Sequence, residues 1–114
     1  MRVKRGTTHV KRRKNLLAKT KGYKWGRKKK IKLATTAAIK AGAHAYRDRK
    51  KKKSTFRSLW NIKINAGSRQ HGLTYSKFMK ALKDKDIRLD RKSLADLAEN
   101  EPKVFEALVK EVVE

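Results

Sequence analysis

Three runs of basic side chains are the residues of this chain with the clearest chemical potential. They occupy residues 11–14, 27–30 and 47–53, and Asp48 is the one acid among them. A Lys or Arg that neutralises a phosphate releases condensed counterions, and a guanidinium can also bind a phosphate through two hydrogen bonds or stack on a base. Four or more consecutive basic residues point in every direction around a helix. These runs therefore predict a polyanionic partner that surrounds the chain, and nucleic acid fits best.

The basic residues are concentrated in one half of the chain, which has 114 residues and a net charge of +24. Residues 1–60 contain 23 Lys and Arg and one acid, whereas residues 61–114 contain 11 Lys and Arg and nine acids. Such an asymmetry is typical of a nucleic-acid-binding arm joined to an ordinary globular part. We expect a basic extension over residues 1–58 and a small globular domain over residues 59–114.

Two aromatic residues in a bend suggest a second kind of contact. Tyr23 and Trp25 lie in the glycine-containing segment 21–26, next to Lys24 and Arg27. RNA-binding proteins commonly stack unpaired bases on such rings, and local packing of the two rings is the alternative. Packed RNA surrounds a threaded helix with phosphate, whereas one groove of a duplex supplies charge on one side only, so RNA is favoured over DNA.

No combination of residues supports catalysis or a bound cofactor. The three histidines lack metal-ligand spacing, no serine has the context of a catalytic triad, and there is no glycine-rich phosphate loop. The chain has no cysteine, which excludes disulfides and thiolate metal sites. No apolar stretch approaches the roughly 20 residues of a membrane span, and an export signal is not expected. We predict a soluble protein that is not an enzyme, with no metal, cofactor, small-molecule substrate or membrane partner.

The elements that must position these residues are predicted to be helices. From Arg27 to about Gln70 the chain lacks proline and is rich in helix formers, which predicts one helix of about 45 residues. Ala34, Ala38, Ala41 and Ala45 form a narrow stripe on this helix. Charged residues surround the stripe, so the helix buries too little apolar surface alone and is expected to order fully only on binding. A shorter helical segment is expected between the glycines at 6 and 22.

The second half has the pattern of three short helices around a small core. Thr74 and Asp90 are predicted N-caps of two of these helices, and Pro102 suits the first turn of the third. Apolar residues recur at helical spacing in each. The expected core comprises Trp60, Ile64, Tyr75, Phe78, Met79, Leu82, Ile87, Leu89, Leu94, Leu97, Ala98, Phe105, Leu108, Val109 and Val112. The fold class is therefore all-α, with a long basic N-terminal helical extension and a small C-terminal helical domain.

Several segments resemble the bacterial large-subunit ribosomal protein L-twenty family over nearly the whole chain. The matching segments are RVKRG at 2–6, AK at 18–19, KGY at 21–23, AYRDR at 45–49, FRSLW at 56–60, INA at 64–66, GLTYSKF at 72–78 and DRKSLADLA at 90–98. This sequence departs from the family pattern at Trp25, at the lysine-rich residues 50–53 and at Asn61, where the family has small or basic, arginine-rich and apolar residues respectively.

The resemblance implies an extension threaded through large-subunit ribosomal RNA, a helical domain on the outer side of the subunit, neighbouring ribosomal proteins as partners, and a role in early subunit assembly in the cytoplasm. In some members it also implies repression of the family's own messenger RNA. The alternatives are a protein that compacts DNA and a regulator that acts mainly through residues 61–114. The residues expected to contact RNA are Arg2, Lys4, Arg5, Lys11, Arg12, Arg13, Lys14, Lys21, Tyr23, Lys24, Trp25, Arg27, Lys28, Lys29, Lys30, Tyr46, Arg47, Arg49, Lys50, Lys53, Arg57 and Arg69.

Overall fold

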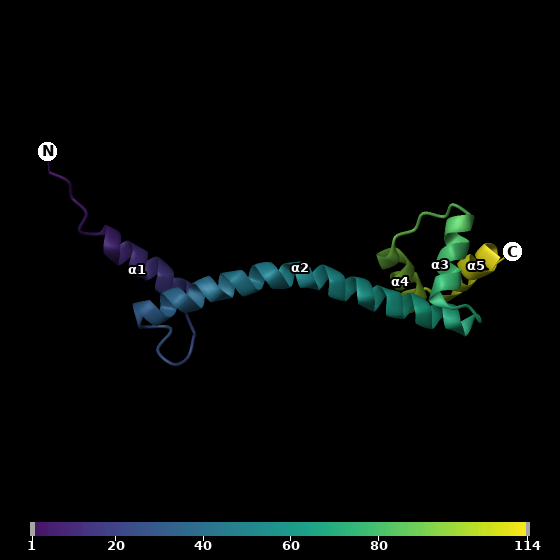
Figure 1. Ribbon diagram of the computed structural model, residues 1–114, viewed down its shortest axis with the longest axis horizontal. Helices are drawn as coiled ribbons and strands as arrows, with labels where there is room; N and C mark the ends of the chain where they lie inside the picture. The colour runs from purple at the N-terminus through teal and green to yellow at the C-terminus, as the bar shows by residue number, and fades with distance from the viewer. Residues whose placement is uncertain (1, 114) are drawn as a thin grey trace. The chain divides into compact units, whose positions relative to one another are not determined.

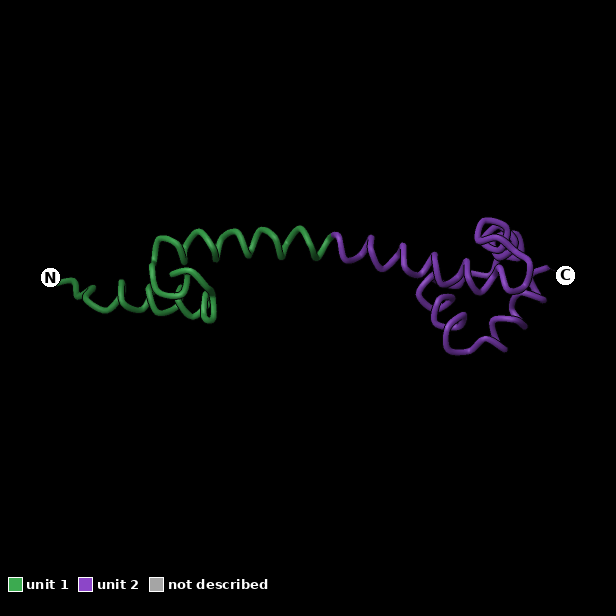
Figure 2. The backbone as a smooth tube through the Cα atoms, turned by 90° about the horizontal axis from the view of Figure 1, so that it is seen from below, with its two compact units in different colours: residues 1–50 green, residues 51–114 purple. Residues whose placement is uncertain are grey.

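The computed structural model describes residues 2–113, and over this range the chain forms five α-helices and no strand. They are α1 (Thr8–Lys19), α2 (Ile31–Gln70), α3 (Tyr75–Asp84), α4 (Arg91–Asn100) and α5 (Pro102–Val113) (Figure 1). The all-α prediction is confirmed. Two compact units are present, residues 1–50 and residues 51–114, and α2 contributes to both (Figure 2). Within residues 2–113, no helix is both long and apolar enough to cross a bilayer.

The first unit contains α1, the bend that follows it and the N-terminal part of α2. Among its described residues, Ala34 and Thr20 are the buried ones, and the Thr20 hydroxyl donates a hydrogen bond to the Leu17 carbonyl at 3.3 Å. Of the predicted alanine stripe, Ala38 is half-buried, and the two members after it are exposed. This unit therefore has little apolar interior, as its charged sequence requires.

Helix α2 begins four residues later than the sequence predicts, at Ile31 rather than Arg27. The delay follows from the bend, because Gly26 has a φ of 78° and cannot belong to a right-handed helix. The Gly26 carbonyl accepts hydrogen bonds from the backbone N–H of Lys29 and Lys30, which closes a separate turn over residues 26–30. The Lys30 carbonyl then accepts from Ala34 at 2.9 Å, and α2 continues from there.

The second unit is built around the core that the apolar pattern predicts. Its fully buried members are Ile64 from α2, Phe78 and Leu82 from α3, Leu94 and Ala95 from α4, and Phe105, Val109 and Val112 from α5. The rings of Phe78 and Phe105 lie 5.3 Å apart between centroids, tilted by 49°. Trp60 and Ile87 are half-buried against this core, as predicted, whereas Ala95 was not anticipated. Leu89 is 41% exposed, so its predicted place in the core is wrong.

Hydrogen-bonded caps explain where the helices of the second unit end. At the end of α2, Gly72 has a φ of 78°, and the N–H groups of Gly72 and Leu73 donate to the carbonyls of Arg69 and Ser68. The same arrangement closes α3, where Asp86 takes the left-handed position with a φ of 52° and Ile87 donates to the Leu82 carbonyl at 2.9 Å. This bond fixes Ile87 against the core, and the chain then leads Leu89 to the surface. Thr74, Asp90 and Pro102 occupy the predicted helix starts.

Candidate nucleic-acid interface

Residues 39–59 of α2 are all exposed, and they contain the densest basic run. At about 100° per residue, the basic side chains of 47–53 are distributed around the whole circumference of the helix. Arg47 donates to the Asp48 carboxylate at 2.9 Å, so the single acid of the run neutralises part of its charge. No face of this stretch is covered by protein among the described residues, and every face carries a cation.

Two aromatic rings on this stretch lie beside lysines. The Lys50 ammonium lies 4.7 Å from the centroid of the Tyr46 ring, and the Lys52 ammonium lies 5.7 Å from that of Phe56. Tyr46 is 59% exposed, so the ring does not serve packing within its unit. The two pairs combine a positive charge with an open π face, which suits contact with phosphate and base together.

Helix α1 contributes a second basic surface. A groove of about 430 Å³ is lined by Arg5, Arg12 and Arg13, with Leu16 and Ile31 supplying apolar wall. Arg13 also donates a hydrogen bond to the Lys29 carbonyl at 3.3 Å, which ties α1 to the turn before α2. The structure thus brings together three arginines that the sequence places in two separate segments, and their guanidinium groups are suited to phosphate.

The two aromatic residues of the bend differ in environment. Tyr23 is half-buried, whereas Trp25 is 84% exposed, with the Arg27 guanidinium carbon 5.9 Å from its ring centroid. The predicted cations around the bend, Lys21, Lys24 and Lys28, are exposed. Of the two rings, Trp25 alone is freely accessible to a ligand.

The two predicted arginines of the second unit lie on exposed parts of α2. Arg57 is exposed, and Arg69 donates to the Asn65 side-chain oxygen at 3.2 Å. That oxygen also accepts a hydrogen bond from the backbone N–H of Tyr75, the first residue of α3. Arg69 is therefore held close to the surface of its own helix.

Sequence reasoning missed a group of cations on the second unit. Lys80, Lys83, Arg88 and Arg91 line a groove of about 630 Å³ together with Asp86. Met79, Leu82, Ile87 and Leu89 supply its apolar wall. The near-neutral charge of residues 61–114 hid this group, because the acids of that half lie mostly elsewhere. The available signal was two pairs of basic residues three apart, Lys80 with Lys83 on α3, and Arg88 of the α3–α4 connector with Arg91 at the start of α4.

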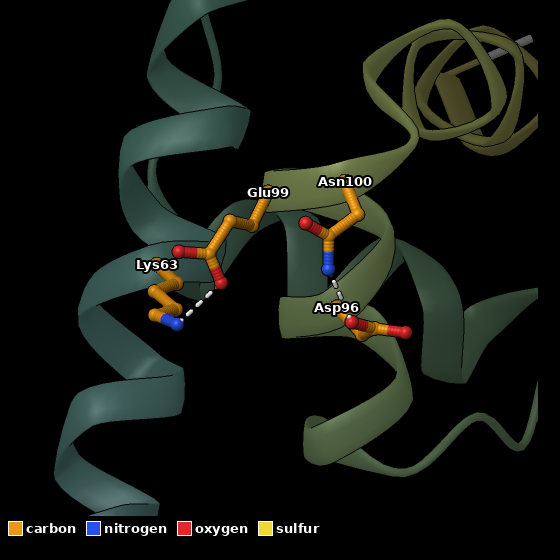
Figure 3. Close-up of polar contacts among 4 residues, drawn as sticks. All are labelled: Lys63, Asp96, Glu99 and Asn100. Carbon is orange, nitrogen blue, oxygen red and sulfur yellow. Dashed lines mark hydrogen bonds and ion pairs between the residues drawn. The ribbon is translucent and has the colours of Figure 1, made fainter.

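Several acidic side chains of the second unit form hydrogen bonds or ion pairs with other side chains of the same unit. Figure 3 shows Lys63 of α2 donating to Glu99 of α4 at 2.5 Å, and Asn100 donating to Asp96 at 2.6 Å. The Ser93 hydroxyl, which donates to the Asp90 carboxylate, lowers the pKa of Asp90. The Lys110 ammonium lowers the pKa of Glu106 in the same way. These carboxylates are therefore poor candidates for proton transfer near neutral pH.

The side chain of Asn61 takes part in a hydrogen-bonded chain with Tyr75 and Arg91. Its side-chain oxygen accepts the Tyr75 hydroxyl at 3.0 Å, and the same hydroxyl accepts a hydrogen bond from Arg91 at 3.0 Å. An apolar residue at position 61 would leave that hydroxyl without its acceptor. Asn61 is thus part of a polar link between α2, α3 and α4.

Among residues 2–113, no three His, Asp or Glu side chains gather into a cluster able to hold a metal ion. The chemistry that the arrangement offers is the binding of anions and planar groups by cations and exposed rings.

Comparisons with known proteins agree with this interpretation. The model of the family described as ribosomal protein L20 matches residues 2–108. The large ribosomal subunit protein bL20 of Leptospira biflexa serovar Patoc is 56% identical over 108 residues, covering 95% of this chain and 92% of that protein. The proteins of the same name from Herminiimonas arsenicoxydans and Ralstonia pickettii are 51% and 49% identical over 111 residues. These cover 97% of this chain and 93% and 94% of the respective relatives. The chain belongs to the ribosomal protein L20 family.

Proposed function

We propose that this chain binds large-subunit ribosomal RNA directly and supports early assembly of the subunit. As a member of the L20 family it is a constituent of the large ribosomal subunit and not an enzyme, and bacterial ribosomes are cytoplasmic. The observation that carries the proposal is the exposed stretch 39–59, which bears cations on all sides of a helix. Only a partner with phosphate on several sides satisfies that arrangement.

In this proposal residues 1–58 thread between RNA segments, and residues 59–114 form a globular part that also meets neighbouring ribosomal proteins. The exposed basic residues of α1, the bend and α2 neutralise phosphates, while exposed rings and guanidinium planes stack on bases. The contributing residues are those expected from the sequence, from Arg2 to Arg69. They include the three arginines of the α1 groove.

The test is incorporation of tagged protein into subunits in a bacterial cell depleted of its own L20. The full chain is compared with a variant in which Arg49 and the lysines at 50–53 are replaced by Gln, which keeps helix propensity and removes charge. The matched control replaces five exposed lysines of the second unit that lie outside the groove of Lys80 and Lys83, namely Lys77, Lys85, Lys92, Lys103 and Lys110. We expect the full chain and the control at full occupancy in large subunits, and the α2 variant largely lost.

Full occupancy of the α2 variant would contradict the proposal. A competition between structured ribosomal RNA and duplex DNA at the same salt concentration addresses the DNA-compacting alternative. Equal displacement by the two polymers would favour compaction, and stronger displacement by RNA supports the proposal.

Regulation of messenger RNA is a second candidate function, and the groove of about 630 Å³ on α3 and the following connector favours it. Arg88 is ion-paired with Asp86 at 3.0 Å, so Lys80, Lys83 and Arg91 beside the apolar wall are the cations that would hold a folded RNA segment without help from the extension. Replacing Lys80 and Lys83 by Glu in the full chain is expected to relieve repression of a reporter gene fused to the untranslated leader of this protein's own messenger RNA. Occupancy of the variant in large subunits is expected to stay high. Unchanged repression would remove this candidate.

A further inference from the structure

The turn that carries Trp25 is an unusual place for a large aromatic residue. The Arg27 N–H donates to the Lys24 carbonyl at 3.3 Å, and both residues between them, Trp25 and Gly26, have positive φ values, 55° and 78°. Turns with two left-handed central residues are dominated by Asn, Asp and Gly, because a Cβ atom crowds the following carbonyl oxygen there, and Asn and Asp offset this with local hydrogen bonds. Backbone preference therefore does not explain a tryptophan at position 25.

Burial does not explain it either. Trp25 is 84% exposed, whereas the other tryptophan of the chain, Trp60, is half-buried against the hydrophobic core. Exposing an indole ring to water is unfavourable, and the Arg27 guanidinium carbon, 5.9 Å from the ring centroid, covers little of it. A residue that is both strained and exposed points to a contact made with a ligand.

The surroundings of the ring identify the kind of ligand. Lys21, Lys24, Arg27 and Lys28 are all exposed in the same short segment, and there is no acid in residues 2–47. A site that binds a partner protein or an apolar ligand would not need so many cations around the ring. A flat π surface among cations is the arrangement with which proteins hold an unstacked base while neutralising its phosphates.

We propose that Trp25 is a stacking platform for a single unpaired nucleobase of the bound RNA. Arg27 supports the ring as a cation, and Lys24 and Lys28 neutralise the phosphates on either side of that nucleotide. This inference rests on the proposed RNA binding and adds a preference for unpaired nucleotides at the bend. The half-buried Tyr23 is less accessible to a base than Trp25.

The experiment uses the full chain and two RNA probes that differ by a single nucleotide. One is a hairpin stem with a single unpaired nucleotide, 2-aminopurine, and the other is the same stem with that nucleotide paired. Affinity for both probes and the fluorescence of 2-aminopurine are measured. The wild-type chain is expected to bind the unpaired probe about 5- to 100-fold more tightly and to quench its fluorescence.

Three variants define the result. Trp25→Gly removes the ring and suits the left-handed backbone, so it is expected to bind the two probes equally and to leave the fluorescence unquenched. Trp25→Phe is expected to retain part of the preference. Lys24→Ala, the control for charge, is expected to weaken both probes by the same factor and to keep the preference.

A Trp25→Gly variant that keeps both the preference and the quenching would overturn the assignment. Equal binding of both probes by the wild-type chain would overturn it too, while leaving general RNA binding intact. Failure of the wild-type chain to bind either probe would contradict the proposed function itself, the direct binding of RNA. The outcomes thus separate the two proposals.

Discussion

At the scale of single residues, Gly67 lies where Ala98 of α4 and Phe105 of α5 pack closely against α2. A Cβ at this position would lie 3.0 Å from a ring carbon of Phe105 and 3.1 Å from the Cβ of Ala98, both tighter than ordinary contact. Gly67→Ala gains about 1 kcal/mol of helix propensity but loses about 1–3 kcal/mol to overpacking. We expect a net loss of about 1 kcal/mol, seen as a lower urea midpoint of the full chain.

Gly42 provides the matched control on the same helix. An added Cβ there meets nothing within 4 Å, so Gly42→Ala gains helix propensity without a clash. It should raise helical content measured by circular dichroism without lowering the urea midpoint. A Gly67→Ala protein as stable as the Gly42→Ala protein would show that α2 and α5 shift apart at no cost, contrary to the packing seen.

The Ser93 hydroxyl provides a second residue-scale test, because it holds the pKa of Asp90 below its ordinary value of 3.8. A carboxyl with a lowered pKa in the folded state adds stability above its ordinary pKa and loses it as the pH falls through the lowered value. Ser93→Ala should therefore raise the pKa of Asp90 in an NMR titration and make stability less dependent on pH below about 4.

Lys110→Ala is the companion variant, since Lys110 lowers the pKa of Glu106 through a hydrogen bond and its charge. It should raise the pKa of Glu106 and leave that of Asp90 unchanged. No shift of the Asp90 pKa in Ser93→Ala would mean that the hydroxyl is not the cause of the lowered value, and a shift in Lys110→Ala would mean that the Lys110 charge also acts on Asp90.

At the scale of elements, apolar spacing predicted the helices and core of the second unit well, because few arrangements bury Phe78, Leu82, Phe105 and Val109 together. Special backbone conformations were harder to predict. Gly72 signals the end of α2 by its residue type, and Asp86 is of a type that tolerates a left-handed conformation, but nothing in Trp25 indicates one. The late start of α2 and the exposure of Leu89 both follow from such turns.

The candidate interface was predictable to the extent that it depends on charge. Runs of Lys and Arg are visible in any linear sequence, and the chain cannot bury them. The groove formed by Lys80, Lys83, Arg88 and Arg91 was not predictable, since it depends on how the connector after α3 folds back beside that helix. The net charge of residues 61–114 is near zero, so a count of charges along the sequence does not reveal that four basic residues line one groove.

Helix α2 leads to a prediction about backbone dynamics. Residues 39–59 have no buried side chain, so their amide hydrogen bonds are sheltered by nothing except the helix itself. In the free protein we expect weak protection from hydrogen exchange over residues 1–55 and strong protection over residues 74–113, where the core lies. Added ribosomal RNA should then protect residues 39–55. Uniform strong protection without RNA would contradict folding on binding.

At the scale of the whole molecule, a net charge of +24 makes salt the most sensitive probe of binding. Each phosphate neutralised by a lysine or arginine contributes a slope of about −0.7 to −0.9 to the dependence of log affinity on log salt. Replacing the four lysines at 50–53 by Gln removes up to four such contacts. We expect the slope to become shallower by roughly 3, measured by filter binding to large-subunit RNA over a salt series.

The same change in net charge placed elsewhere separates local contact from general attraction. Replacing Lys77, Lys85, Lys92 and Lys103 by Gln removes four exposed charges from the second unit, outside the groove formed with Lys80 and Lys83. If α2 is enclosed by phosphate, this variant changes the slope by less than one, because its lysines face solvent in the complex and keep their counterions there. Equal changes in the two variants would mean that RNA responds only to total charge, in which case the exposed helix would have no special part in binding.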